Sequence, residues 1–380
     1  MEWITKEQYL PSLDKDIDYS RHGIGLIGCG SIANQAHLPA YKKLGLQVAA
    51  CCDVDAEAAR KTAEAFDIPF WTTDIRELLQ RREVTILDMA VHPKARMALL
   101  EQIAKAPRPV LCQKPLDVDL RQARKLGEFA REHGIVMGLN QQARWAPAHR
   151  ALRLLLDQGL TGDIYAIQHT MRAFQDQEGW WWTRMEDFNI VDHGIHYLDL
   201  CRYFAQSPSS PALEWERLHC ATAMQPGQQS ISPLIYAVNI EYGEVGGRSP
   251  LMAALQFNNI VRAGNAHSYT WWIDGKDGSI WGDQERLYVA MTKAPSTVHE
   301  IRIKGKWFPD GFAGSMAAFI AAVDRGEAPP VPVDDHYNTI ALTTAMTRSS
   351  KEGRVVERIA VLQEATGGEQ AAAAGEGGQP

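Results

Sequence analysis

The sequence predicts an α/β protein in which a doubly wound parallel sheet precedes a second, α+β domain with a large open, mainly antiparallel sheet. Short apolar runs alternate with amphipathic helical patterns between residues 22 and 139, as in a parallel sheet covered by helices. From Ala146 onward, apolar and polar residues alternate over long runs, which is typical of an antiparallel sheet with one packed face. The 380 residues, of which 45% are hydrophobic, suffice for two cores.

The first half contains five predicted strands, at residues 22–27, 47–52, 86–91, 110–112 and 135–139. The spacing of apolar residues predicts helices over 56–66, 75–80, 95–106 and 120–133. Strands that alternate with helices in this way pair in parallel.

The second half opens with a predicted helix at 147–158, which ends at the glycines of 159–162. Strands are predicted at 164–172, 237–242, 251–258 and 269–273, and residues 274–279 read as a hairpin turn. Helices follow at 313–324 and 337–350, with a proline-rich connector at 328–333.

We therefore divide the chain into an N-terminal arm at 1–20, a first domain at 21–145 and a second domain at 146–362. Residues 363–380 hold too few large apolar groups to offset the entropy of ordering. We expect this tail to be disordered.

Charge and composition exclude several classes of partner. The net charge is −7 and no basic run is present, which argues against nucleic acid and anionic membranes. The first twenty residues lack the apolar core of a signal peptide or membrane span, so we expect a cytoplasmic protein. Six cysteines lie mainly in apolar segments without the paired spacing of zinc sites, which favours reduced, buried thiols.

A glycine-rich turn follows the first predicted strand, where a helical pattern begins. Gly28 suits the tight turn, Gly30 allows a pyrophosphate to approach the backbone, and the small Ala33 lets the helix pack on its strand. The second strand ends at Asp53, where a carboxylate can accept hydrogen bonds from ribose hydroxyls. This arrangement predicts a dinucleotide site that favours NAD over NADP; alternatively, Asp53 only ends its strand and caps the next helix.

Lys114 lies directly after the predicted strand 110–112, between Gln113 and Pro115. Residues just past the carboxyl ends of strands border the ligand crevice of a doubly wound sheet, so Lys114 is expected near the cofactor. An exposed loop charge is the alternative.

Asp192 and His196 lie four residues apart at the start of an apolar helical stretch. On one helical face the carboxylate can orient the imidazole and raise its proton affinity, which makes the pair a candidate acid/base for hydroxyl chemistry. Two alternatives remain: Asp192 is a helix cap beside a packed histidine, or these two residues bind a metal together with His193 and Asp199. The acid/base role is our prediction, with no metal.

Three consecutive tryptophans precede this pair, at 180–182, and Arg184 follows them. Aromatic rings stack on the C–H faces of sugars, and a guanidinium grips anions with two hydrogen bonds. We expect Trp181, Trp182 and Arg184 to contribute to a substrate wall; packing is the alternative role for the tryptophans.

Taken together, the glycine turn, the lysine–proline pair and the pattern Asp-x-Gly-x-His-x-x-Asp resemble the Gfo/Idh/MocA oxidoreductases. The resemblance runs from about residue 23 to about residue 355 and includes Asn140 to Pro147, similar to the crossover into the second domain. It implies a Rossmann domain that binds NAD and an open-sheet domain that often forms the oligomer interface. Sugars, polyols and related compounds are the implied substrates.

The resemblance assigns roles position by position. Lys114 matches the lysine that contacts the reacting hydroxyl, and Asp192 and His196 match the acidic residue and histidine near the nicotinamide. We assign substrate contacts to Arg144 and His193 as well. The expected cofactor contacts are Gly28, Gly30, Ser31, Ile32, Asp53, His92, Pro93, Gln113, Lys114 and Asn140.

Two positions depart from the family pattern. Gln113 stands where glutamate is usual, and residues 188–190 precede Asp192 where small glycine-rich residues are common. We predict an NAD-dependent oxidoreductase that acts on a secondary alcohol or carbonyl of a sugar, polyol or glycoside, as a homodimer or homotetramer. One alternative is an NAD-dependent glycosidase that oxidises its sugar transiently without net redox change, and another is a non-catalytic NAD-binding sensor.

Overall fold

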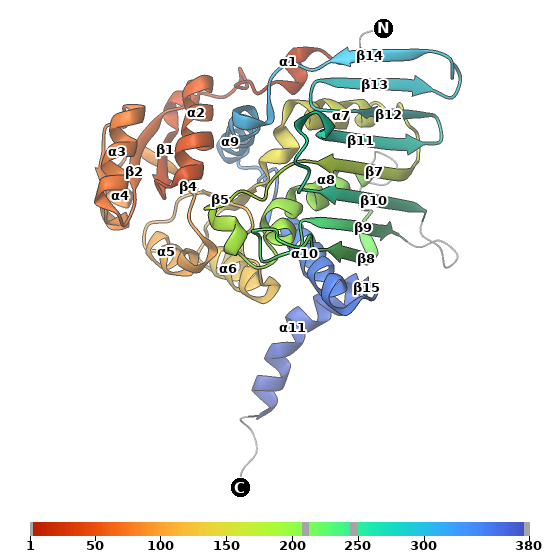
Figure 1. Cartoon of the computed structure of the whole chain (residues 1–380). Coiled ribbons are helices and arrows are strands. Elements are labelled where there is room, and N and C mark those ends of the chain that lie inside the picture. The colour runs from red at the N-terminus through yellow and green to blue at the C-terminus, as the bar shows by residue number, and fades with distance from the viewer. Residues whose placement is uncertain (1–2, 207–212, 244–249, 376–380) are drawn as a thin grey trace. The chain divides into compact units, whose positions relative to one another are not determined.

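Two sheets organise the chain, each within one of two units (Figure 1). The computed structural model describes residues 3–206, 213–243 and 250–375. The first unit comprises Met1–Asp117, Gln122–Leu154 and Ile303–Tyr337, and the second comprises Val118–Arg121, Leu155–Arg302 and Asn338–Pro380.

The sheet of the first unit has six parallel strands in the order β3-β2-β1-β4-β5-β6. The central strand β1 is buried along its whole length. The chain builds outward from β1 to β3 on one side and from β4 to β6 on the other, so the doubly wound prediction is confirmed. The order reverses at β1 and β4, which is where such sheets form their ligand crevice. The strands are β1 Gly23–Ile27, β2 Val48–Cys52, β3 Trp71–Thr72, β4 Val84–Met89, β5 Val110–Gln113 and β6 Met137–Asn140.

Helices connect these strands: the π-helical turn η2 at Ala33–His37, α2 at Leu38–Leu44, α3 at Ala56–Phe66, α4 at Ile75–Gln80, η3 at Pro93–Ala95, α5 at Arg96–Ile103 and α6 at Leu120–Glu132. Later in the chain, α9 (Trp307–Arg325) packs against α2 and η2. Its Phe312, Met316 and Phe319 join Ile24 and Tyr41 in one core cluster. Residues 303–337 thus belong to the first unit, a return that the predicted division at residue 145 does not contain.

The second unit contains a nine-stranded sheet in the order β14-β13-β12-β11-β7-β10-β9-β8-β15. Only β7 and β10 pair in parallel among the pairs of this sheet in the described residues. Buried and exposed residues alternate along the strands, which confirms the predicted open, mainly antiparallel sheet. The strands are β7 Ile164–Arg172, β8 Trp215–Ala223, β9 Ile235–Tyr242, β10 Leu251–Asn258, β11 Ser268–Gly275, β12 Gly278–Gly282, β13 Arg286–Met291, β14 Val298–Arg302 and β15 Val356–Glu357.

The remaining α-helices are α1 Lys6–Tyr9, α7 Pro147–Asp157, α8 Ile195–Ala205, α10 Val333–Glu352 and α11 Arg358–Gly375. Helix α11 enters the segment predicted to be disordered, because its run of alanines has the highest helix propensity. Residues 376–380 of that prediction lie outside the described part. No helix in the described residues is long and apolar enough to span a membrane. All six cysteines are buried and none forms a disulfide.

The first unit contains a buried histidine with a consequence for acid stability. His149 donates a hydrogen bond from Nδ1 to the Ala143 carbonyl (2.8 Å), and its ring lies edge-on to Trp307. Burial lowers the pKa of His149 from 6.5 to about 4. The folded protein therefore holds this ring neutral where the unfolded chain would protonate it, and stability falls as the pH drops from about 6.5 to about 4.

We predict that the His149→Gln variant loses less stability on acidification than the wild type. The shift corresponds to up to about 3 kcal/mol at the acid end. Denaturant unfolding at pH 7 and pH 4.5 measures it. Equal acid sensitivity of the two proteins would contradict the assignment.

Candidate active site

The glycine-rich turn after β1 has the geometry that a dinucleotide site requires. Gly28 has φ +99°, and a Cβ there would lie 2.8 Å from Val91 and 2.9 Å from the Ala90 carbonyl, so only glycine fits. A Cβ on Gly30 would meet no heavy atom of the described residues within 4 Å. Packing does not require glycine at position 30, whereas close approach of a ligand does. Ala33 is fully buried in the core cluster, as its predicted packing role demands.

Asp53 fixes this turn from the end of β2. Its Oδ2 accepts a hydrogen bond from the Cys29 N–H (2.7 Å), and its Oδ1 accepts one from the Asp55 N–H (2.9 Å). Asp55, two residues later, is the cap of helix α3. The capping role considered for Asp53 is therefore wrong, and its carboxylate lies against the turn that it was predicted to serve.

Ser31 and Ile32 form the first helical residues after Gly30, so their N–H groups lie at a helix N-terminus, where anions are stabilised. Asn34 braces this start by donating hydrogen bonds to the Cys29 and Gly30 carbonyls. Thr62 of α3 in turn donates to the Asn34 side chain. The turn is thus held by contacts that leave Gly30 exposed.

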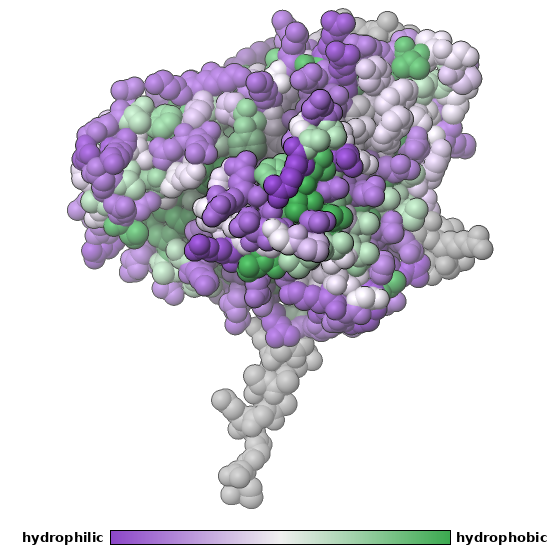
Figure 2. All heavy atoms as spheres, viewed as in Figure 1, coloured by the Kyte–Doolittle hydropathy of each residue, from purple (hydrophilic) through white to green (hydrophobic). Residues whose placement is uncertain are grey.

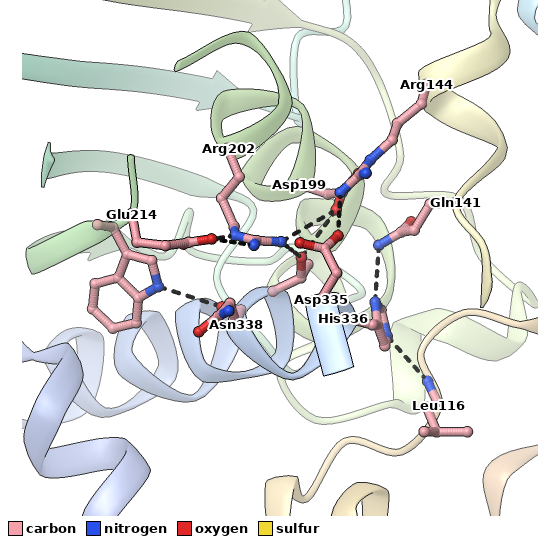
Figure 3. A network of polar contacts seen from close by, with 11 residues as sticks. Leu116, Gln141, Arg144, Asp199, Arg202, Glu214, Asp335, His336 and Asn338 are labelled. Carbon is pink, nitrogen blue, oxygen red and sulfur yellow. Dashed lines mark hydrogen bonds and ion pairs between the residues drawn. The ribbon is translucent and has the colours of Figure 1, made fainter. Parts of the chain in front are cut away.

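The turn after β5, which carries Lys114, is fixed by three buried side chains of the same unit. Gln113 accepts a hydrogen bond from the Lys114 N–H (2.8 Å). Arg96 donates to the carbonyls of Pro115 and Leu116. The Leu116 N–H donates to Nε2 of His336, whose other ring nitrogen faces the Gln141 amide (Figure 3). Lys114 itself is half-buried. Its side chain extends from a main chain that these hydrogen bonds hold in place.

Arg96 is a functional candidate that the sequence analysis missed. Its guanidinium is 1% exposed and also donates to the Val91 carbonyl (2.9 Å), just before His92 and Pro93. Burial lowers the pKa of this group. Arg96 therefore joins the turn after β4 to the turn after β5. An arginine in a helical segment gives no signal of such a role, because its partners are all backbone carbonyls.

Asn140 ends β6 beside Gln113 and is fully buried. Neither its amide nitrogen nor its amide oxygen has a hydrogen-bond partner within the described residues. A buried amide without partners is costly, and a ligand at this edge of the sheet would satisfy it. Asn140, together with the open space at Gly30, fits a dinucleotide in the first unit.

In the second unit, a π-helical turn η6 (Asn189–Gly194) leads into α8 and carries Asp192 and His193. His196 lies in the first turn of α8 and is 8% exposed, while Asp192 and His193 are half-buried. A Cβ on Gly194 would lie 2.5 Å from the Asn189 carbonyl oxygen, so the last residue of this π-helical turn must be glycine. The sequence analysis expected a regular helix here, and π-helical turns are frequent at functional sites.

A stack of aromatic rings supports this turn. Nε2 of His193 lies 3.4 Å from the Tyr197 hydroxyl, and the Tyr197 ring stacks on the buried His169. His169 donates from Nδ1 to the Thr270 carbonyl and stacks on Trp271. The position of His193 is thus set by the core of the open-sheet unit.

Phe188 and Asn189, which depart from the family pattern, pack against named neighbours. The Phe188 ring is parallel to the Trp182 ring at 5.6 Å, and the Asn189 carbonyl accepts a hydrogen bond from Tyr236 (2.9 Å). Trp182 also donates to the Gln175 carbonyl. Trp182 is therefore held by packing, whereas 56% of Trp181 is exposed. Arg184 is exposed as well.

Arg144, a predicted substrate contact, and Asp199, considered only for the alternative metal site, are held in an ion pair and a hydrogen bond. Arg144 is 9% exposed and pairs with Asp335 (2.9 Å) in the first unit. In the second unit, Asp199 accepts a hydrogen bond from Thr339 (2.9 Å), which also accepts one from Arg202 (Figure 3). In the described part of the chain, no three His, Cys, Asp or Glu side chains form a group that could hold a metal ion.

Two family models match the chain over most of its length. The model described as "Oxidoreductase family, NAD-binding Rossmann fold" matches residues 22–141, and the model described as "Oxidoreductase family, C-terminal alpha/beta domain" matches residues 153–357. The chain belongs to the Gfo/Idh/MocA oxidoreductase family. Its first unit is accordingly an NAD-binding Rossmann domain, and the predicted cofactor is confirmed as NAD.

Several relatives of this Gfo/Idh/MocA protein match nearly end to end. A D-apiose dehydrogenase from Rhizobium rhizogenes is 29% identical over 357 residues, 89% of this chain and 97% of the relative. A second D-apiose dehydrogenase, from Paraburkholderia graminis, is 26% identical over 87% and 88% of the two chains. A 1,5-anhydro-D-fructose reductase from Ensifer adhaerens is 25% identical over 88% and 97%.

Solved structures share the fold. An oxidoreductase from Agrobacterium radiobacter, in complex with NAD+, L-tartaric acid and magnesium, matches with a TM-score of 0.75 at 20% identity, over 90% of this chain and 99% of that one. A levoglucosan dehydrogenase in complex with NADH and levoglucosan matches with a TM-score of 0.73 at 17% identity, over 88% and 99%.

We predict that Gly30→Ala weakens NAD binding without destabilising the fold. The added methyl group meets no protein atom but occupies the space in which the pyrophosphate approaches the backbone, so the Kd for NAD should rise about tenfold or more. Calorimetric titration with NAD and thermal unfolding measure the two effects separately.

Gly264→Ala is the matched control, since a Cβ there also meets no atom within 4 Å and the residue belongs to the second unit. It should change neither quantity. Unaltered NAD affinity in Gly30→Ala would contradict the placement of the cofactor at this turn.

Proposed function

We propose that this protein is an NAD-dependent dehydrogenase or reductase that acts on a secondary alcohol or carbonyl of a sugar or polyol. The observation that carries the proposal is the fixed position of Lys114 at the carboxyl edge of the NAD-binding sheet, with its peptide bonded to Gln113 and the following carbonyls to Arg96. A charged donor on a preorganised turn is suited to stabilise an oxygen on which charge develops.

Lys114 is assigned to the reacting oxygen. Its ammonium group donates a hydrogen bond to the substrate hydroxyl and stabilises the alkoxide character that grows as the proton leaves. The half-buried position of the side chain strengthens this interaction, because partial exclusion of water lowers the local dielectric constant.

His196 is assigned as the acid/base and Asp192 as the residue that orients it. A nearly buried imidazole can take the hydroxyl proton near neutral pH and return it in the reverse direction. NAD, when bound, supplies the acceptor or donor of the hydride, and the residues proposed to hold it are Gly28, Gly30, Ser31, Ile32, Asp53, His92, Pro93, Gln113 and Asn140.

The carbohydrate class of the substrate is supported by the relatives, whose names specify apiose and anhydrofructose as compounds they act on. The exposed Trp181 offers a ring face for stacking against a sugar, and Arg184 and His193 offer polar contacts. The Arg144 guanidinium is already paired with Asp335. We therefore propose that Arg144 contacts the substrate as part of this ion pair and does not serve as a separate anion-binding group.

We also propose that the open face of the nine-stranded sheet forms a contact between copies of the chain. Trp272, Trp281 and Tyr288 stack in a row across β11, β12 and β13 on this face, and Met252 on β10 is half exposed. Apolar side chains in such a row are costly in water unless covered.

Substituting Trp272→Glu should shift the assembly toward monomers, because it places a charge at one end of the aromatic row, where a partner copy would bury it. Light scattering after size-exclusion chromatography measures the mass. Val54→Glu, at a 96% exposed residue of the other unit, is the control and should leave the mass unchanged. A monomeric wild type would contradict the proposed contact.

We predict that Lys114→Met and His196→Asn each lower kcat by about 10² to 10⁴-fold, because each removes a group that acts on the moving proton or the developing charge. NAD binding should persist in His196→Asn, whose substitution lies outside the Rossmann domain. Steady-state kinetics with the best substrate of a sugar and polyol panel measures the effect.

Lys105→Met is the control for the loss of a lysine, since this exposed residue bonds only to Gln102 among the hydrogen bonds described. Its kcat should equal that of the wild type. Full activity in Lys114→Met or His196→Asn would overturn the assigned roles.

A further inference from the structure

A buried histidine lies behind the turn that carries Lys114. His37 of η2 and Asp88 of β4 are both fully buried, and Nδ1 of His37 lies 2.7 Å from Oδ2 of Asp88. The other ring nitrogen, Nε2, lies 3.0 Å from Nε2 of Gln113. Gln113 therefore bridges His37 and the Lys114 peptide.

The Lys114 N–H, at one end of this series of hydrogen bonds, determines which group donates in each of them. A peptide N–H can only donate, so the Gln113 atom that faces Lys114 is its oxygen, at 2.8 Å. The amide nitrogen of Gln113, which can only donate, then faces His37. Nε2 of His37 must be an acceptor, and the ring proton lies on Nδ1, where it is donated to Asp88.

Two neighbours hold the imidazole in this state. The Tyr41 hydroxyl donates to the same Asp88 oxygen (2.6 Å), and burial, with Asp88 beside it, raises the pKa of Tyr41 well above its ordinary value. The Phe312 ring packs 4.8 Å from the His37 ring. The Lys114 N–H thus donates to Gln113, Gln113 donates to His37, and His37 donates to the buried carboxylate of Asp88.

We propose that His37, as a neutral imidazole with its proton on Nδ1, is a positioning residue that fixes the Lys114 turn through the Gln113 amide. This proposal deepens the proposed function and rests on the assignment of Lys114 to the reacting oxygen. An imidazolium would present the hydrogen on its Nε2 to the Gln113 amide nitrogen, which is also a donor, and the hydrogen bond between His37 and Gln113 would be lost.

The proposal accounts for glutamine at position 113, where the family pattern has glutamate. A glutamate can accept from the Lys114 N–H but cannot donate to His37 unless it is protonated. With a carboxylate on either side, His37 would take a second proton on Nε2. Glutamine at 113 and a neutral His37 are therefore matched to one another.

The protonation state is tested directly by ¹⁵N NMR of histidine-labelled protein, with His37→Gln used to assign the resonances. We expect the wild type to show Nδ1 protonated and Nε2 unprotonated near neutral pH, and Gln113→Glu to show both nitrogens protonated. A wild-type His37 that is an imidazolium, or that carries its proton on Nε2, would overturn the proposal.

The positioning role is tested by kinetics of His37→Leu, Lys114→Met and the double variant. His37→Leu should lower kcat about 10- to 100-fold through misplacement of Lys114, with NAD affinity retained. In the Lys114→Met background the same change should have little further effect, because both act through one group. Multiplicative losses would contradict the role.

His37→Gln keeps one acceptor and one donor and should restore most of the activity, and it serves if His37→Leu does not fold. His149→Leu removes another buried histidine of the first unit and should leave kcat unchanged. Full activity in Lys114→Met would refute the proposed function. The NMR experiment tests the protonation state of His37 independently of that function.

Discussion

The buried guanidinium of Arg96 is the constraint on which the carboxyl edge of the parallel sheet depends. It has no carboxylate partner in the hydrogen bonds described and instead satisfies carbonyls of two successive turns, at Val91 and at Pro115 and Leu116. Burying a charge is costly unless it is hydrogen-bonded, and here the two terminal nitrogens of Arg96 bond to carbonyls of both turns, which ties the turns to their positions. Lys114 lies on one of these turns, and His92 and Pro93 follow the other.

The two units solve the same problem by different means. In the first unit, side chains bonded to backbone groups fix the residues around the cofactor edge, including Asp53 on the Cys29 N–H. In the second, a π-helical turn that only Gly194 allows presents Asp192 and His193, and aromatic packing from Tyr197 and His169 sets the ring positions. The candidate site side chains in both units thus project from backbone that is held by several contacts.

Most of the fold could be predicted from the sequence because its periodicities are strong. The helices at 56–66 and 75–80 and the strands at 164–172 and 251–258 were predicted at their observed bounds, and these segments have clear apolar spacing. Strands β3, β8, β12, β13, β14 and β15 were missed. Strands β3 and β15 have two residues each, and β14 is short and has no buried residue, so burial cannot impose a pattern on these sequences. The return of α9 to the first unit depends on long-range packing of Phe312, Met316 and Phe319, which local patterns do not report.

The candidate site divides in the same way. Gly28, Gly30 and Asp53 could be found because a dinucleotide turn needs fixed residue types at fixed spacing. Arg96 and His336 could not, since the partners that matter are backbone groups or an amide, and neither could His37, whose partners Asp88 and Gln113 lie far from it in sequence. The prediction of a regular helix at Asp192 was wrong for a local reason. Gly194 permits a wider, π-helical turn, which a Cβ at this position would block.

The central claim, that the protein transfers a hydride between NAD and a sugar or polyol, is tested most directly by anaerobic incubation with NAD and a panel of sugars, polyols and glycosides. The absorbance of the reduced nicotinamide and mass spectrometry of the products are followed together. Our account predicts NADH in stoichiometric amount with a ketone or lactone product. A cleaved glycoside without net NADH would contradict it in favour of a redox-neutral glycosidase, and tight NAD binding without turnover would contradict it in favour of a sensor.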